Sequence, residues 1–117
     1  MGFKNDCQKL LDQYVSYYRS GDAVGCASVY TVEAELYSPF GPPAIGRAAI
    51  KVTHEEWFEE GADNKQIKVM SAGCSGDLGW CVACFSEGTT GNGSSVSVLK
   101  LQPDGRWLIT HSSLNEK

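Results

Sequence analysis

The sequence has no apolar run that approaches the roughly 18 residues of a transmembrane helix. Its first residues, Met1–Asp6, contain no hydrophobic core of a secretory signal, and Asp6 stands where the myristoylation pattern requires Ser or Thr. We therefore expect a cytoplasmic protein that has no membrane partner.

Basic residues are also scarce. The 117 residues include 10 Lys and Arg against 14 Asp and Glu, which gives a net charge of −4. Nucleic-acid-binding domains use a concentrated basic patch to neutralise phosphates, so this balance argues against a nucleic-acid partner.

The five cysteines are not expected to form a disulfide framework, because their number is odd and no secretion signal accompanies them. Cys81 and Cys84 have C-x-x-C spacing, but they lie within a predicted strand, whereas the redox motif opens a helix. No second pair at zinc-site spacing is present. We predict that the cysteines are small buried apolar residues, with a redox or metal role as the alternative. They are Cys7, Cys26, Cys74, Cys81 and Cys84.

Several catalytic motifs are missing as well. Two histidines cannot build a three-histidine metal site, and the segment that starts like H-E-x-x-H at His54 ends in Phe58. The chain has no G-x-S-x-G nucleophile elbow, and the glycine-rich loop predicted at 88–93 lacks the Lys of a phosphate-binding loop. We therefore expect no metal and no organic cofactor.

What is present is the pattern of one domain over residues 1–117, a length that can bury a hydrophobic core without disulfides. Apolar residues recur with helical spacing from Cys7 to Tyr18, after Asn5 or Asp6 as the cap. Two more helices are predicted at 23–30, capped by Asp22, and at 46–60, ended by Gly61. Strands are predicted at 33–40, 65–74, 80–87, 96–101 and 107–113, with a rigid proline-rich loop at 39–43.

The predicted order is α-α-β-α-β-β-β-β. Helices that precede an antiparallel sheet are typical of an α+β fold in which the helices cover one sheet face. The nearly all-apolar strand at 80–87 indicates that both of its faces are covered.

Three segments resemble the nuclear-transport-factor-2-like (cystatin-like roll) superfamily, in its SnoaL-like and ketosteroid-isomerase-like branches. They are Ser20–Asp22 between two helices, Tyr37–Gly41 followed by Ile45–Ile50, and the final hairpin Gln102–His111. The resemblance covers nearly the whole chain. It implies a curved antiparallel sheet wrapped around the N-terminal helices, forming a cone with a central pocket, and a homodimer through the outer sheet face.

The alternation of the strand at 80–87 then places Trp80, Val82 and Cys84 inside the cone. Cys81, Ala83 and Phe85 would face outward beside Val96 and Val98, forming an apolar surface that a second copy could cover. A single bulge would reverse this assignment.

Steroid isomerisation needs a carboxylate base and donors to the enolate oxygen. By the resemblance, the phenol donor corresponds to Tyr14, the base to Ser38 and the second donor to a position near Ser97. A neutral serine cannot replace the carboxylate, so we argue against steroid isomerase activity. Helical spacing alone also makes Tyr14 a core residue.

His54 lies on the apolar stripe of the third predicted helix, near the mouth of the implied pocket. A partly buried histidine there could act as a general base or proton shuttle. The alternative is a histidine whose ring is simply paired with a backbone group or a tyrosine. His111 is interpreted as a residue of the sheet surface or of a dimer contact.

The leading hypothesis is a homodimeric domain that binds a small apolar molecule in the cone. If the domain is an enzyme, the expected reaction is proton transfer or hydrolysis, with His54 as base and Tyr14 as donor. The alternative is a non-catalytic homodimerisation or assembly module, whose cone is filled by its own side chains. The predicted pocket residues are Tyr14, Tyr18, Ser38, Phe40, His54, Trp57, Trp80, Val82 and Ser97.

Overall fold

The computed structural model describes residues 2–59, 65–87 and 90–116. Within these ranges the helices and strands follow the predicted order, with one additional short strand. They are α1 (Phe3–Arg19), α2 (Ala23–Ser28), β1 (Tyr30–Ser38), β2 (Gly41–Ile45), α3 (Arg47–Phe58), β3 (Lys65–Ser75), β4 (Leu78–Glu87), β5 (Thr90–Leu101) and β6 (Trp107–Glu116).

Helix α1 buries one stripe of side chains, Cys7, Leu11, Tyr14 and Tyr18, spaced at three and four residues as the sequence predicted. The predicted cap is wrong, because the helix begins at Phe3 and its N-cap makes no side-chain hydrogen bond. The backbone therefore turns into the helix before Asn5 and Asp6 are reached.

The second helix confirms its predicted start. The Asp22 carboxylate accepts a hydrogen bond of 2.8 Å from the backbone N–H of Gly25, as an N-cap residue does. The helix ends at Ser28, earlier than predicted, because Tyr30 is already the first residue of β1.

The six strands form one sheet in the order β2-β1-β6-β5-β4-β3. All neighbours are antiparallel except β1 and β6, which run parallel, so the prediction of a purely antiparallel sheet is corrected at this one pair. The predicted loop at 39–43 is also corrected, because Gly41–Ile45 forms β2. Pro42 and Pro43 fit there because β2 is an edge strand, where a missing N–H need not break a ladder.

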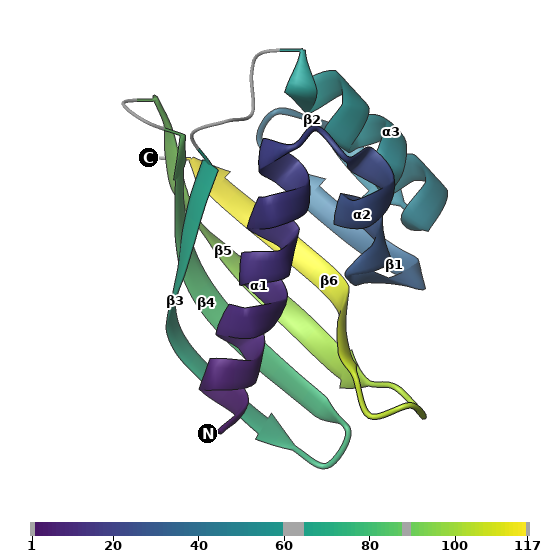
Figure 1. Cartoon of the computed structure of the whole chain (residues 1–117), viewed down its shortest axis with the longest axis vertical. Coiled ribbons are helices and arrows are strands. Elements are labelled where there is room, and N and C mark those ends of the chain that lie inside the picture. Colours follow the sequence, from purple (N-terminus) through teal and green to yellow (C-terminus); the bar gives the residue numbers. More distant parts are fainter. Residues whose placement is uncertain (1, 60–64, 88–89, 117) are drawn as a thin grey trace.

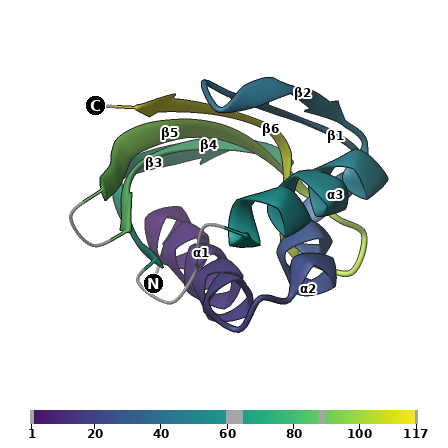
Figure 2. The ribbon, with the colours of Figure 1, turned by 90° about the horizontal axis from the view of Figure 1, so that it is seen from above.

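The sheet curves around the helices rather than closing into a barrel (Figures 1 and 2). Helix α1 runs across the concave face and packs mainly on β3, while α3 packs on β1 and β2. Helix α2 lies against both of the other helices at the open side of the curve (Figure 2). This arrangement is the predicted α+β cone.

The predicted orientation of β4 is wrong. Cys81, Ala83 and Phe85 are buried on the concave face, and Trp80 is 45% exposed on the convex face. Cys81 and Ala83 belong to the core cluster that includes Cys7 and Leu11 of α1, and Trp80 lies outside it. Because residues 80–85 are all apolar, the sequence does not show which alternate set faces the helix.

Two predictions fall partly outside the described residues. The helix stop at Gly61 lies there, and so do residues 88 and 89 of the loop predicted at 88–93. The rest of that loop is corrected, because β5 begins at Thr90.

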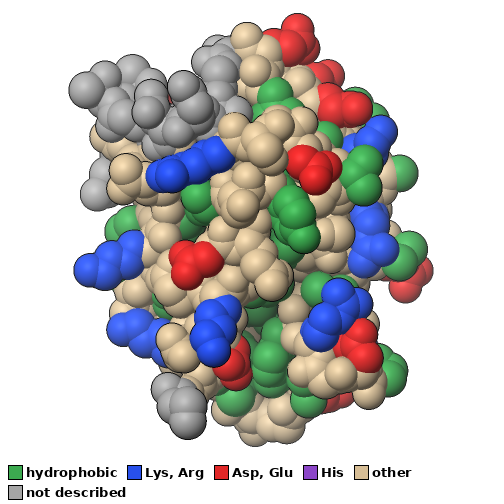
Figure 3. All heavy atoms as spheres, in the orientation of Figure 1, with side chains coloured by type: hydrophobic (Ala, Val, Ile, Leu, Met, Phe, Trp, Pro, Cys, Tyr) green, Lys and Arg blue, Asp and Glu red, His purple; other side chains and the backbone are tan. Residues whose placement is uncertain are grey.

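Charged side chains of both signs are spread over the face that carries α1, and acidic side chains gather at the upper right, where α3 lies (Figure 3). No helix among the described residues combines the length and the apolarity that a membrane crossing requires.

Candidate functional site

Tyr14 and His54 meet inside the cone. The Tyr14 hydroxyl lies 2.7 Å from Nε2 of His54, and Nδ1 of His54 lies 2.8 Å from the backbone carbonyl oxygen of Ile50. A carbonyl oxygen only accepts, so Nδ1 carries the proton and Nε2 accepts the proton of the Tyr14 hydroxyl. Both ring nitrogens of His54 are therefore engaged.

Burial keeps His54 neutral, although its hydrogen bond to the Ile50 carbonyl favours the charged form. Its side chain is 0% exposed, and burial lowers the pKa of the imidazole to about 4. The ring lies among aromatic neighbours, with the Trp57 ring centroid 4.8 Å away and the Tyr14 centroid 5.4 Å away. Tyr14, Tyr18, His54 and Trp57 thus lie together in one packed cluster of rings.

A small cavity of about 30 Å³ lies beside this cluster, between the concave face of the sheet and α1. Ser97 and Ser112 line it, and their hydroxyl oxygens are 3.1 Å apart in a hydrogen bond. The space holds about two water molecules. Its described lining consists of Leu11, Tyr14, Tyr30, Lys65, Ile67, Phe85, Ser95, Ser97, Ile109, Ser112 and Leu114.

Lys65 is the residue of this site that the sequence did not single out. It is the first residue of β3 and only 5% exposed. Its Nζ lies 4.6 Å from the ring centroid of Tyr18 and 4.8 Å from that of Phe85. The one sequence signal was the alternation Lys65, Ile67, Val69, which puts the lysine on the inner face.

The end of α1 fixes the start of β3. Nε of Arg19 donates a hydrogen bond of 2.8 Å to the backbone carbonyl of Lys65. This contact holds the first residue of β3 against the helix that carries Tyr14 and Tyr18. The position of the Lys65 side chain is therefore set by two elements far apart in the sequence.

Only two of the nine predicted pocket residues, Tyr14 and Ser97, are in the described cavity lining. Three others lie in the packed cluster beside it, namely Tyr18, His54 and Trp57. The remaining four lie elsewhere. Ser38 sits at the end of β1, where its hydroxyl accepts a hydrogen bond of 3.2 Å from the backbone N–H of Phe40. Phe40 is exposed, with its ring centroid 6.2 Å from that of Trp57. Trp80 and Val82 follow the corrected orientation of β4 and lie on the convex face, where they pair with Val98 and Val96 of β5.

His111 lies on β6 with its Nε2 3.7 Å from a carboxylate oxygen of Glu35 on β1. About half of its side chain is exposed. Its position on the sheet surface agrees with the sequence interpretation.

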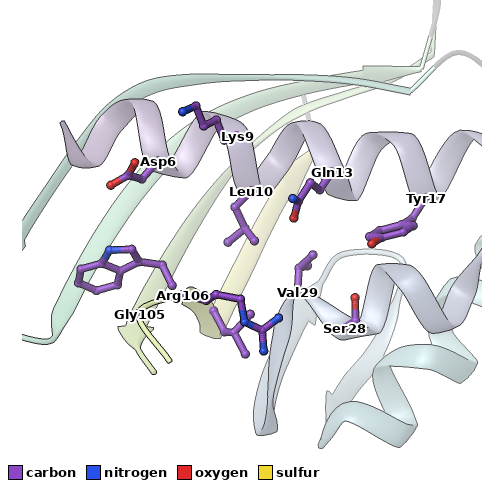
Figure 4. A pocket seen from close by; sticks show the side chains of 11 residues that line it. Asp6, Lys9, Leu10, Gln13, Tyr17, Ser28, Val29, Gly105 and Arg106 are labelled. Atoms are coloured by element: carbon purple, nitrogen blue, oxygen red, sulfur yellow. The ribbon is translucent and has the colours of Figure 1, made fainter. Parts of the chain in front are cut away.

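A second, larger hollow of about 340 Å³ lies between α1 and the start of β6 (Figure 4). Leu10, Gln13 and Tyr17 border it from α1, and Arg106 lies on the opposite side (Figure 4). Arg106 is exposed and already paired with Asp104, with Nε 2.8 Å from a carboxylate oxygen. No predicted site residue borders this hollow, so the cone remains the candidate site.

All five cysteines are free thiols. Cys7, Cys26 and Cys81 are buried and Cys84 is partly buried, as predicted, but Cys74 is exposed. Among the described residues, no group of three or more His, Cys, Asp or Glu side chains is arranged to hold a metal ion.

No protein-family model and no curated protein matches this sequence. Solved structures do. A nuclear-transport-factor-2-like protein of unknown function from Shewanella oneidensis has 16% identity and a TM-score of 0.79, covering 94% of this chain and 96% of that one. A protein of unknown function with a cystatin-like fold from Nostoc punctiforme has 12% identity and a TM-score of 0.80, with coverages of 97% and 90%.

A ketosteroid isomerase-like protein from Erwinia carotovora atroseptica is 15% identical to this chain, with a TM-score of 0.77. The match covers 93% of this chain and 92% of that one. Identities this low establish the fold and leave the activity open. The chain has the nuclear-transport-factor-2-like, cystatin-like fold that its sequence motifs predicted.

Proposed function

We propose that the chain is a small-molecule-binding domain whose ligand occupies the cone beside Lys65. The observation that carries this proposal is the lining of the cavity, where a buried lysine and the Ser97–Ser112 hydroxyl pair sit among apolar side chains. Ligand sites combine apolar walls with a few fixed polar groups, and buried ionisable residues gather at functional sites. A cavity of about 30 Å³ suits a very small ligand.

Within this proposal Tyr14 meets the ligand and His54 holds Tyr14 in place. A general base must come within hydrogen-bond reach of the proton that it removes. Tyr14 borders the cavity, whereas both nitrogens of His54 are engaged by Tyr14 and Ile50. We therefore propose binding rather than proton transfer or hydrolysis at His54.

The test is a crystal structure of the protein purified directly from cells, together with native mass spectrometry. We expect electron density for a ligand beside Lys65, and an added mass on the intact protein that matches this ligand. Ser97→Leu fills the cavity and should remove the added mass, whereas Val96→Trp adds comparable bulk on the exposed convex face and should retain it. A ligand mass that persists in Ser97→Leu would contradict the proposal.

A second candidate function is self-association through the convex sheet face. Three apolar side chains on the adjacent strands β4 and β5 are exposed there: Trp80 at 45%, Val96 at 46% and Val98 at 37%. Exposed apolar patches often mark interaction sites, and a two-fold axis would let the same patch of a second copy cover each one. This supports the alternative of a homodimerisation module.

Sedimentation velocity over a range of concentrations tests this second function. We expect a dimer, and we expect Val96→Lys to dissociate it because a buried unpaired ammonium is costly. Val24→Lys places the same charge on the exposed surface of α2 and should leave the dimer intact. A wild-type protein that stays monomeric at high concentration would contradict the proposal.

A further inference from the structure

The lysine of the cone is an unusual residue to bury. Lysine side chains are rarely buried in proteins, because removing an ammonium from water is costly unless other groups stabilise it. The Lys65 ammonium lies close to the faces of the Tyr18 and Phe85 rings, and such cation–π contacts are strongest when water is excluded. The fold therefore holds a positive charge at the edge of the cavity.

This charge acts on the groups around it. A positive charge on Lys65 adds to the effect of burial in lowering the pKa of His54. At Cys26 it partly offsets burial, which raises the pKa of that thiol. In both cases the charge acts through the protein interior. Charges interact more strongly there than in water, so an anion in the cavity would also feel this field.

Hydroxyl groups provide the second part of the site. Ser95, Ser97, Ser112 and Tyr14 border the same cavity as Lys65. A hydroxyl has a single proton, and that of Tyr14 is donated to His54, so the groups that can donate to an anionic oxygen are Ser95 and one hydroxyl of the Ser97–Ser112 pair. No Asp or Glu is among the described residues that line the cavity, which would otherwise repel an anion.

We propose that the ligand of the cone is a small organic carboxylate, with its carboxylate at Lys65 and the serine hydroxyls and its short tail against Ile67 and Leu114. This inference rests on the proposed function, because it names the ligand class of the same cavity. Room for about two water molecules fits formate or acetate better than a longer acid.

The experiment titrates the isotope-labelled full chain with sodium acetate and follows the backbone amide signals by NMR at constant ionic strength. Acetamide serves as the neutral probe of nearly the same shape, and sodium chloride as the simple anion. We expect saturable shifts at Ser97 and Ser112 with acetate, and binding at least tenfold weaker with acetamide and chloride.

Two variants complete the test. Lys65→Met keeps the length and apolar stem of the side chain and should weaken acetate binding at least tenfold. Lys68→Met makes the same change at an exposed position of β3 and should leave acetate binding unchanged. The comparison of acetate with acetamide on the wild-type chain remains decisive even where Lys65→Met fails to fold.

The outcomes separate this inference from the proposed function. Equal binding of acetate and acetamide, or of acetate and chloride, overturns the carboxylate assignment and leaves a cone that binds small molecules. Absence of any acetate-induced shift at the cone also overturns the assignment. If crystals of the protein purified from cells then show a neutral molecule in the cone, the proposed function as a small-molecule-binding domain still holds.

Discussion

The Tyr14 hydroxyl and Nε2 of His54 join α1 to α3 through a buried hydrogen bond of 2.7 Å. The two residues are 40 positions apart in the sequence, and the bond satisfies the one imidazole nitrogen that the helix backbone does not reach. The sequence suggested Tyr14 and His54 as a catalytic pair. In the structure their hydrogen bond joins α1 to α3.

Tyr14→Phe should lower the free energy of unfolding by roughly 1–3 kcal/mol, because it leaves a buried acceptor nitrogen without a donor. Urea unfolding measures the loss. Tyr37→Phe is the matched control, since the Tyr37 hydroxyl donates to Glu35 at an exposed site, and it should cost less than about 0.5 kcal/mol. Equal losses in the two variants would mean that the Tyr14–His54 bond contributes no more than a surface contact.

Acid should destabilise the fold through His54. Its pKa is about 4 in the folded chain, against the ordinary histidine value of 6.5 in the unfolded chain, so only the unfolded chain binds the proton between these two pH values. Stability contributed by the neutral ring is complete above pH 6.5 and is lost as the pH falls toward 4, by roughly 3 kcal/mol. Urea unfolding from pH 7 to 4 measures this loss.

The control for this pH dependence is His111→Gln, because His111 is half exposed beside Glu35. It should keep the wild-type pH dependence over this range. His54→Gln keeps groups that can donate and accept hydrogen bonds but cannot take up a proton in this pH range. Its unfolding free energy should therefore change less between pH 7 and pH 4 than that of the wild type. If the unfolding free energy of His54→Gln falls with pH as steeply as that of the wild type, other groups cause the acid sensitivity.

Thiol reactivity should distinguish the cysteines. Cys74 is exposed and should react with a disulfide reagent in the native protein, whereas Cys26 is buried, and burial raises its pKa to about 12. Cys7 is protected as well, because its hydrogen bond with Cys81 and its burial raise its pKa. Absorbance at pH 8 follows the reaction, and Cys74→Ser should remove the fastest phase. Fast labelling that survives Cys74→Ser would assign the fastest phase to the partly buried Cys84 or to a buried thiol, and not to Cys74.

Gly93→Ala should destabilise the fold by roughly 1–3 kcal/mol, the usual cost of overpacking. A Cβ at Gly93 would lie 2.0 Å from the backbone oxygen of Asn115 on β6, and backbone cannot move aside cheaply. Gly41→Ala is the control, because a Cβ there meets nothing within 4 Å. Thermal unfolding compares the two variants. A melting temperature of Gly93→Ala equal to that of Gly41→Ala would rule out this close approach.

Much of the fold could be predicted from the sequence because local signals coincide with it. The spacing of Cys7, Leu11, Tyr14 and Tyr18 defines the buried stripe of α1, and Asp22 caps α2 as expected. Strand β2 was missed because Pro42 and Pro43 indicate a loop, and only the edge position in the sheet makes them compatible with a strand.

The site was less predictable, because its residues are defined by packing. The exposure of Trp80 on the convex face depends on where α1 crosses the sheet, and the uninterrupted apolar run at 80–85 carries no alternation to show it. Lys65 would be taken as a surface residue, since lysine usually is. Its environment comes from Tyr18 and Phe85, which lie far from it in the sequence.

The parallel pairing of β1 with β6 has a consequence for synthesis on the ribosome. Strand β6 lies between β1 and β5, so β1 has β2 as its only sheet neighbour until residues 107–116 have emerged. The nascent chain can form the α1–α2 pair and the β3–β4–β5 meander early, but the two parts of the sheet join only when β6 inserts between them. Chaperone protection of the nascent chain is thus expected to matter most in that interval, when unpaired strand edges are exposed.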